Sequence, residues 1–192
     1  MLVLGSRLLN TPVMSLHTGA RLAQLRWPVI DPANLKIVAY ELEGPLLAET
    51  PSYLRTADIR EYAHLGMIVD SNDEFVGLED VIKIKQLVEL GFPLVGMQVI
   101  DEFKRKLGKV EDYTLDTKSF FVQQLHVRRG LLRGGITDTG LLIHRTQIVE
   151  INNTNIVVRT TARQLKPIEE VKFLNPFRQR PNTETQPEHM GR

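Results

Sequence analysis

The chain has 192 residues, of which 42% are hydrophobic and 24% charged, and its formal net charge is +1. This composition is typical of a globular protein that buries a core. The absence of cysteine excludes disulfides, thiolate metal sites and a cysteine nucleophile. The apolar run before Gly5 is too short for a signal peptide or a membrane span, so we expect a cytoplasmic protein without membrane insertion.

Two parts of the chain resemble each other in sequence. Residues 11–43 align with residues 97–127, and residues 57–71 align with residues 146–160. Matched positions include Leu22 and Leu107, Leu25 and Val110, Asp31 and Asp116, and Met67 and Ile156. We therefore predict an internal duplication of a unit of roughly 65 residues.

Each unit is predicted to be all-β. In the first unit, apolar and polar residues alternate over 21–30 and again over 36–42, and the turn residues Asp31 to Asn34 separate these two strands. The corresponding strands of the second unit are predicted over 106–115 and 119–127. A short hairpin is predicted to end each unit, over 59–69 in the first and 148–158 in the second.

One helix is predicted between the units, within residues 78–93. Its apolar positions share one face, Gly91 is a candidate C-terminal cap, and Pro93 prevents continuation of the helix. The end of the chain has little to bury and no periodicity, so we predict a largely disordered extension over 166–192.

The second unit carries a longer motif. A hydrophobic pair, Val99-Ile100, is followed by Leu107-Gly108-Lys109-Val110-Glu111-Asp112 and by the turn residue Asp116. This pattern resembles the PRC-barrel family of small β-barrels. The first unit is looser, because Ala23 stands in place of Gly108 and Trp27-Pro28 stands in place of Asp112-Tyr113.

The resemblance implies a mainly β chain of two small PRC-like β-barrels in tandem, joined by one α-helix. The expected boundaries are 1–75 for the first barrel, 76–92 for the connecting helix, 93–165 for the second barrel and 166–192 for the extension. The family is known for binding rather than catalysis. It includes the C-terminal module of a bacterial ribosome maturation factor, whose N-terminal domain has no counterpart in this sequence.

No motif for catalysis, a cofactor or a metal is found. Gly108-Lys109 does not make a phosphate-binding loop, because Phe103 and Val110 stand where a glycine and a hydroxyl residue are needed. The five histidines include no i, i+4 pair of the kind that binds zinc. We therefore predict a non-enzyme, and we interpret Gly108 as a glycine that eases the backbone at a strand entry or bulge.

The best candidate for a functional surface is basic. From residue 93 onward the chain has 16 Lys and Arg against 11 Asp and Glu. The candidate residues are Lys104, Arg105, Lys106, Arg128, Arg129, Leu131, Leu132 and Arg133. Such a cluster has the cations to contact phosphates, but the sequence favours the simpler interpretation of a solvated turn and loop over a nucleic-acid surface. The two leucines inside a polar loop suggest an apolar anchor for a protein partner.

Two functions follow as hypotheses. The first is a non-enzymatic adaptor or scaffold that acts through protein–protein contacts. The second is an RNA- or ribosome-associated factor that uses the basic second barrel.

Overall fold

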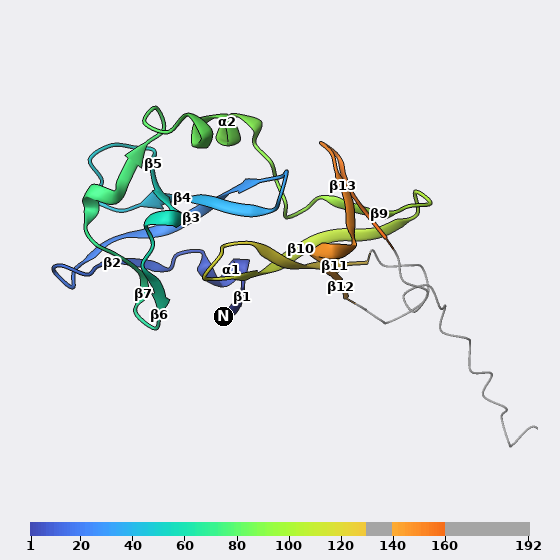
Figure 1. Ribbon diagram of the computed structural model, residues 1–192, viewed down its shortest axis with the longest axis horizontal. Helices are drawn as coiled ribbons and strands as arrows, with labels where there is room; N and C mark the ends of the chain where they lie inside the picture. The colour runs from blue at the N-terminus through green and yellow to red at the C-terminus, as the bar shows by residue number, and fades with distance from the viewer. Residues whose placement is uncertain (130–139, 160–192) are drawn as a thin grey trace, which may run out of the picture. The chain divides into compact units, whose positions relative to one another are not determined.

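The computed structural model describes residues 1–129 and 140–159 (Figure 1). In this part of the chain the protein is mainly β, as predicted, with two sheets and two α-helices, α1 (Gly5–Leu8) and α2 (Ile82–Leu90). No helix of these residues is long and apolar enough to cross a membrane. The predicted C-terminal extension over 166–192 lies outside the described residues.

The first sheet has seven strands in the order β6-β7-β2-β3-β4-β5-β8. Their bounds are β2 (Pro12–Ser15), β3 (Arg21–Asp31), β4 (Lys36–Glu43), β5 (Ser52–Arg55), β6 (Glu61–Ala63), β7 (Gly66–Val69) and β8 (Phe75–Gly77). The alternating pattern at the start of β3 buries Ala23 and Leu25, and its partner β4 buries Ile37 in the same core. Strand β7 runs parallel to β2, with Val13 opposite Met67.

The second sheet has the order β12-β11-β10-β9-β14-β13, and β1 is added beside β10. The bounds are β1 (Leu2–Leu4), β9 (Gln98–Asp101), β10 (Lys106–Asp116), β11 (Val122–Arg128), β12 (Leu141–His144), β13 (Ile148–Ile151) and β14 (Asn155–Val158). Strand β14 runs parallel to β9, with Val99 opposite Ile156. The core strands of this sheet therefore repeat those of the first sheet in the same order.

The repeat extends to single hydrogen bonds. Leu25 N donates to Thr11 O at 2.9 Å, and the matching Val110 N donates to Met97 O, also at 2.9 Å. The matched turn residues Leu35 and Phe120 both have positive φ, 58° and 56°. Three short 3₁₀ helices are η1 (Thr56–Asp58), η2 (Asn72–Glu74) and η3 (Arg145–Gln147), of which η1 and η3 precede the last hairpin of each copy. The internal duplication predicted from the sequence is present in the structure.

Neither sheet closes into a barrel within the described residues, so the expectation of two β-barrels needs correction. Strands β6 and β8 end the first sheet, and β12 and β13 end the second. Closure requires the end strands of a sheet to pair. Instead, η1 and η3 turn the chain between the fourth strand of each copy and its last hairpin, and β8 extends the first sheet outward beyond β5.

A symmetric contact joins the two sheets. Ile37 N donates to Phe120 O at 2.8 Å, and Val122 N donates to Leu35 O at 3.0 Å. Ile37 matches Val122 and Leu35 matches Phe120 in the repeat, so the contact has the self-complementary form of a twofold interface. One hydrophobic core contains buried residues of both sheets. Strand β1, which was expected in the first barrel, pairs with β10 of the second sheet.

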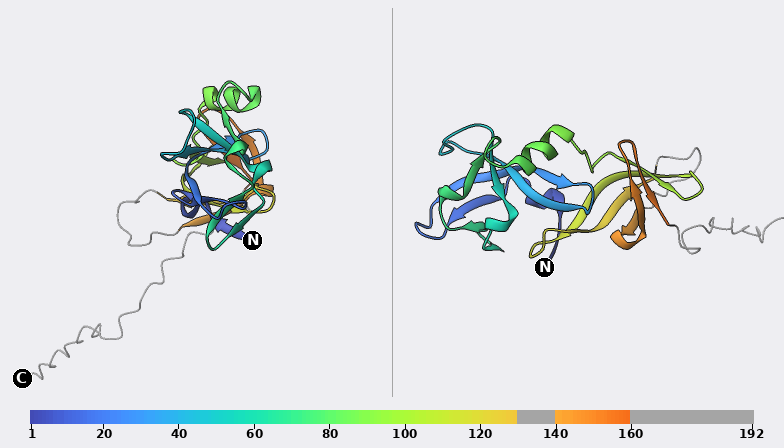
Figure 2. Two further views of the ribbon diagram at one scale, coloured as in Figure 1. Left: turned by 90° about the vertical axis from the view of Figure 1, so that its left-hand side faces the viewer. Right: turned by 45° about the horizontal axis from the view of Figure 1, so that its top comes forward.

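Helix α2 covers the outer face of the first sheet (Figure 2). Its Ile84 is buried against Val29, Ala39 and Tyr53. The helix ends at Gly91, which is left-handed at φ 60° and donates its N–H to two carbonyls of the last turn, as predicted for a C-terminal cap.

Candidate functional site

The residues predicted for a basic surface lie around one end of β10 and β11. Lys104 is in the β9–β10 turn, Lys106 begins β10 and Arg128 ends β11. Arg129 follows β11 and is exposed. Leu131, Leu132 and Arg133 lie outside the described residues, so the structure brings together only the flanks of the predicted loop.

The side chain of Arg105 stabilises the β9–β10 turn and is not presented to a partner. Its Nε lies 2.6 Å from Asp101 Oδ2, and its guanidinium lies over the ring of Phe103 at 5.2 Å. Asp101 has only 1% of its side chain exposed and also accepts the backbone N–H groups of Phe103 and Arg105. Burial alone raises the pKa of Asp101, but these hydrogen bonds and the cation outweigh it and lower the pKa below its usual value.

Lys109 joins the basic surface, although the sequence interpretation did not include it. It lies directly opposite Arg128 in the β10–β11 pair. Like charges that face each other across two strands are unfavourable. Glu111 offsets part of this repulsion, because its Oε1 lies 3.0 Å from Arg128 Nη2.

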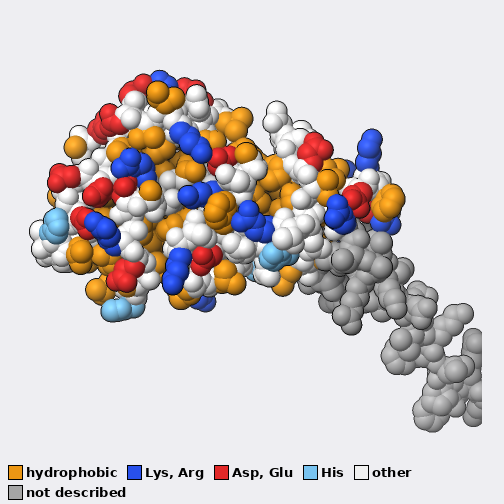
Figure 3. Space-filling view, viewed as in Figure 1, with side chains coloured by type: hydrophobic (Ala, Val, Ile, Leu, Met, Phe, Trp, Pro, Cys, Tyr) orange, Lys and Arg blue, Asp and Glu red, His pale blue; other side chains and the backbone are white. Residues whose placement is uncertain are grey.

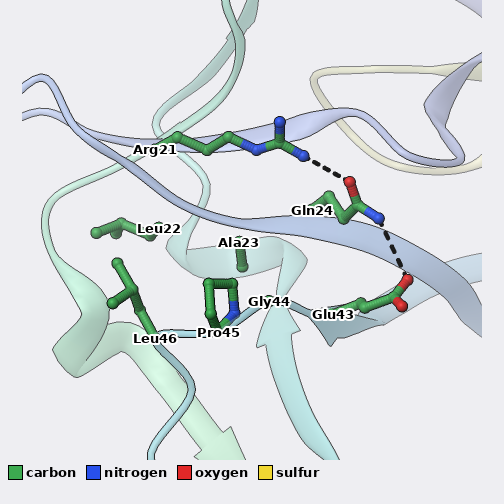
Figure 4. A pocket seen from close by; sticks show the side chains of 8 residues that line it. All are labelled: Arg21, Leu22, Ala23, Gln24, Glu43, Gly44, Pro45 and Leu46. Atoms are coloured by element: carbon green, nitrogen blue, oxygen red, sulfur yellow. Dashed lines mark hydrogen bonds between the residues drawn. The ribbon is translucent and has the colours of Figure 1, made fainter.

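The first copy has a neutral counterpart of this surface. Arg21, Gln24 and Glu43 occupy the positions that match Lys106, Lys109 and Arg128. Arg21 Nη2 donates to Gln24 Oε1 at 2.5 Å, and Gln24 Nε2 donates to Glu43 Oε2 at 3.2 Å (Figure 4). These side chains line an open hollow of about 650 Å³. The first copy thus balances its own charges where the second presents cations.

A different surface, the apolar groove, lies where the two copies meet. It has a volume of about 360 Å³. Its lining residues are Gly5, Ser6, Leu9, Trp27, Pro28, Ile30, Phe92, Pro93, Leu94, Val95, Glu111, Asp112 and Tyr113. A smaller hollow of about 220 Å³ shares Trp27, Pro28, Ile30 and Phe92 with it. On the face seen in Figure 3, hydrophobic side chains gather below α2.

The groove is lined by matched positions that have diverged. Pro28 of the first copy corresponds to Tyr113 of the second, and Trp27 corresponds to Asp112. Trp27 is 56% exposed. Burial, and then the charge of Asp112, raise the pKa of Tyr113, so its hydroxyl stays protonated. The sequence signal for this site was the interruption of the repeat at Trp27-Pro28.

Asp112 holds helix α1 against strand β10 at the groove. Its Oδ2 accepts the hydroxyl of Ser6 at 2.6 Å, and its Oδ1 accepts the N–H of Ser6 at 3.2 Å and that of Tyr113 at 2.8 Å. Among the described residues, no group of three or more His, Asp or Glu side chains is arranged to hold a metal ion.

Comparison with known proteins supports the resemblance in part. Residues 90–165 match the family model of the PRC-barrel domain. The match does not extend over the first copy. No curated protein matches the chain. The chain therefore contains a PRC-barrel domain, and this domain covers the second of its two copies.

Proposed function

We propose that this chain is a non-enzymatic cytoplasmic adaptor that acts through protein–protein contacts at the apolar groove. The observation that carries the proposal is the exposed Trp27 at the rim of a concave apolar surface between the two copies. Large aromatic side chains in such positions contribute most of the affinity in many protein interfaces.

We also propose that the first copy is a diverged PRC-type module, so that two such modules stand in tandem. Its strand order, its bulges and its turn conformations match those of the second copy. Both copies supply walls to the groove. In this proposal the duplication serves to build one docking surface from two modules.

Replacement of Trp27 by alanine is expected to weaken partner binding about tenfold or more, because it removes a large exposed aromatic side chain from the groove. Affinity capture followed by mass spectrometry should find a reproducible partner with the natural chain and lose it with Trp27→Ala. Binding of the purified partner is then measured by calorimetry. Leu65→Ala is the matched control, since Leu65 is equally exposed but lies in the β6–β7 turn. Turnover of a metabolite without any protein partner would contradict the proposal.

RNA binding by the second copy is the second candidate function, and the opposed cations Lys109 and Arg128 favour it. The double variant Lys106→Ala/Lys109→Ala is expected to weaken binding to single-stranded RNA and to lower the slope of log affinity against log salt by about 1.4. Fluorescence anisotropy at several salt concentrations measures both effects. Lys118→Ala, in the β10–β11 turn, is the control. Salt-independent binding would count against this function.

A further inference from the structure

We infer that the apolar groove binds a protein segment in which a large apolar side chain stands next to a lysine or arginine. The inference rests on the proposed protein-docking function and adds the chemistry of the partner. It follows from two properties of the groove, its apolar walls and the sign of its charges.

The apolar walls are presented to solvent. Trp27 and Val95 are both more than half exposed, at 56% and 52%, and Phe92 is partly buried between the groove and the neighbouring hollow. Water leaves such a surface when a large apolar side chain covers it, and the free energy gained scales with the area covered. A partner segment with one large apolar side chain fits this space.

The charged residues that line the two hollows are all acidic. Glu111 and Asp112 line the groove, and Glu41 lines the smaller hollow. Glu111 is paired with Arg128, and Glu41 lies 3.5 Å from Arg26. The charged side chains in the lining of these hollows are carboxylates, which repel phosphates, so this surface does not favour nucleic acid.

Asp112 differs from these two acids. Its three hydrogen-bond donors are the neutral hydroxyl and N–H of Ser6 and the N–H of Tyr113. Within residues 1–129 and 140–159, no Lys, Arg or His side chain lies at ion-pair distance from it. Asp112 is of intermediate exposure and stands beside the apolar walls of the groove, so a partner's cation can reach its carboxylate while the neighbouring apolar side chain covers the walls.

The test uses Trp27 as its own reporter, because it is the single tryptophan of the chain. Its fluorescence is recorded while short peptides are added to the full chain. The peptides share one Leu–Phe core and differ only in their flanks, which are arginines, glutamines or glutamates. We expect a saturable change with the arginine-flanked peptide and dissociation constants at least about tenfold weaker for the other two.

Asp112→Asn keeps the shape and the Oδ1 acceptor for the Ser6 N–H but removes the charge, and its amide group can donate to the Ser6 hydroxyl in place of accepting from it. This variant is expected to weaken the binding of the arginine-flanked peptide about tenfold and to leave the binding of the glutamine-flanked peptide unchanged. Glu61→Gln removes an exposed carboxylate in β6, outside the groove, and should change neither. Thermal unfolding of both variants verifies that the fold is intact.

Equal binding of the arginine and glutamine peptides would overturn the inference about charge and leave the docking function standing. A lack of response to all three peptides would overturn the inference as a whole. The proposed function is judged separately by the capture experiment with Trp27→Ala, so the two failures are distinguishable.

Discussion

Gly108→Val is expected to destabilise the chain by about 3 kcal/mol or more, as the sum of backbone strain and a steric clash. Gly108 has φ 147°, which side-chain-bearing residues rarely adopt, at the bulge between β9 and β10. A Cβ at this position would collide with the carbonyl oxygen of Arg128 and lie 2.8 Å from its carbonyl carbon. Backbone atoms of a paired strand cannot move away without breaking the pairing.

Chemical denaturation measures this effect as a change in the free energy of unfolding. Gly140→Ala is the control, because nothing lies within 4 Å of a Cβ built there. In the first copy, Ala23 stands at the matching position. The glycine there is Gly44, whose backbone lies close to Ala23: a Cβ built on Gly44 would be 3.1 Å from Ala23 Cα. If Gly108→Val is as stable as the natural chain, then β11 can shift to make room for the new side chain and our geometric account is wrong.

Asp101→Ala is expected to lower the free energy of unfolding by about 3 kcal/mol. The substitution leaves two N–H groups of the β9–β10 turn without their acceptor and Arg105 without its counter-charge. Asp101→Asn keeps one acceptor and should cost less. Glu102→Ala is the matched control: Glu102 is the neighbouring acid, and its ion pair within the described residues is an exposed one with Arg159 at 3.5 Å, which contributes little. Thermal and denaturant unfolding compare the three variants, and equal costs for Asp101→Ala and Glu102→Ala would refute the role of the buried turn.

The pH dependence of stability gives an independent check on Asp101. Its pKa in the folded chain is lowered, so its stabilising contribution is fully present above the unfolded-state carboxyl pKa of about 3.9. The contribution is lost as the pH falls through the lower folded-state pKa. We expect the natural chain to lose stability over this acid range more steeply than Asp101→Asn, and parallel curves for the two would contradict the assignment.

Features governed by local contacts were predictable from residues close in sequence. The C-terminal cap at Gly91 and the bulge at Gly108 both depend on backbone conformations that favour glycine. The repeat was visible because the same positions face the core in both copies, as Leu25 and Val110 do. Part of the basic surface was visible too, but the pairing of Arg105 with Asp101 could not be recognised, because it is identified only by burial and distance.

The mainly β class, the duplication and the PRC-type motif of the second copy were predictable from residue order alone, because alternation and turn residues establish which side chains face a core. The open edges of the sheets, the pairing of Leu35 and Ile37 with Phe120 and Val122, and the position of Lys109 opposite Arg128 became known from the folded chain. The fold also placed Trp27 and Asp112 on one groove. These outcomes depend on which strand edges meet and what covers each face, and such contacts join residues far apart in the chain, so no local pattern specifies them.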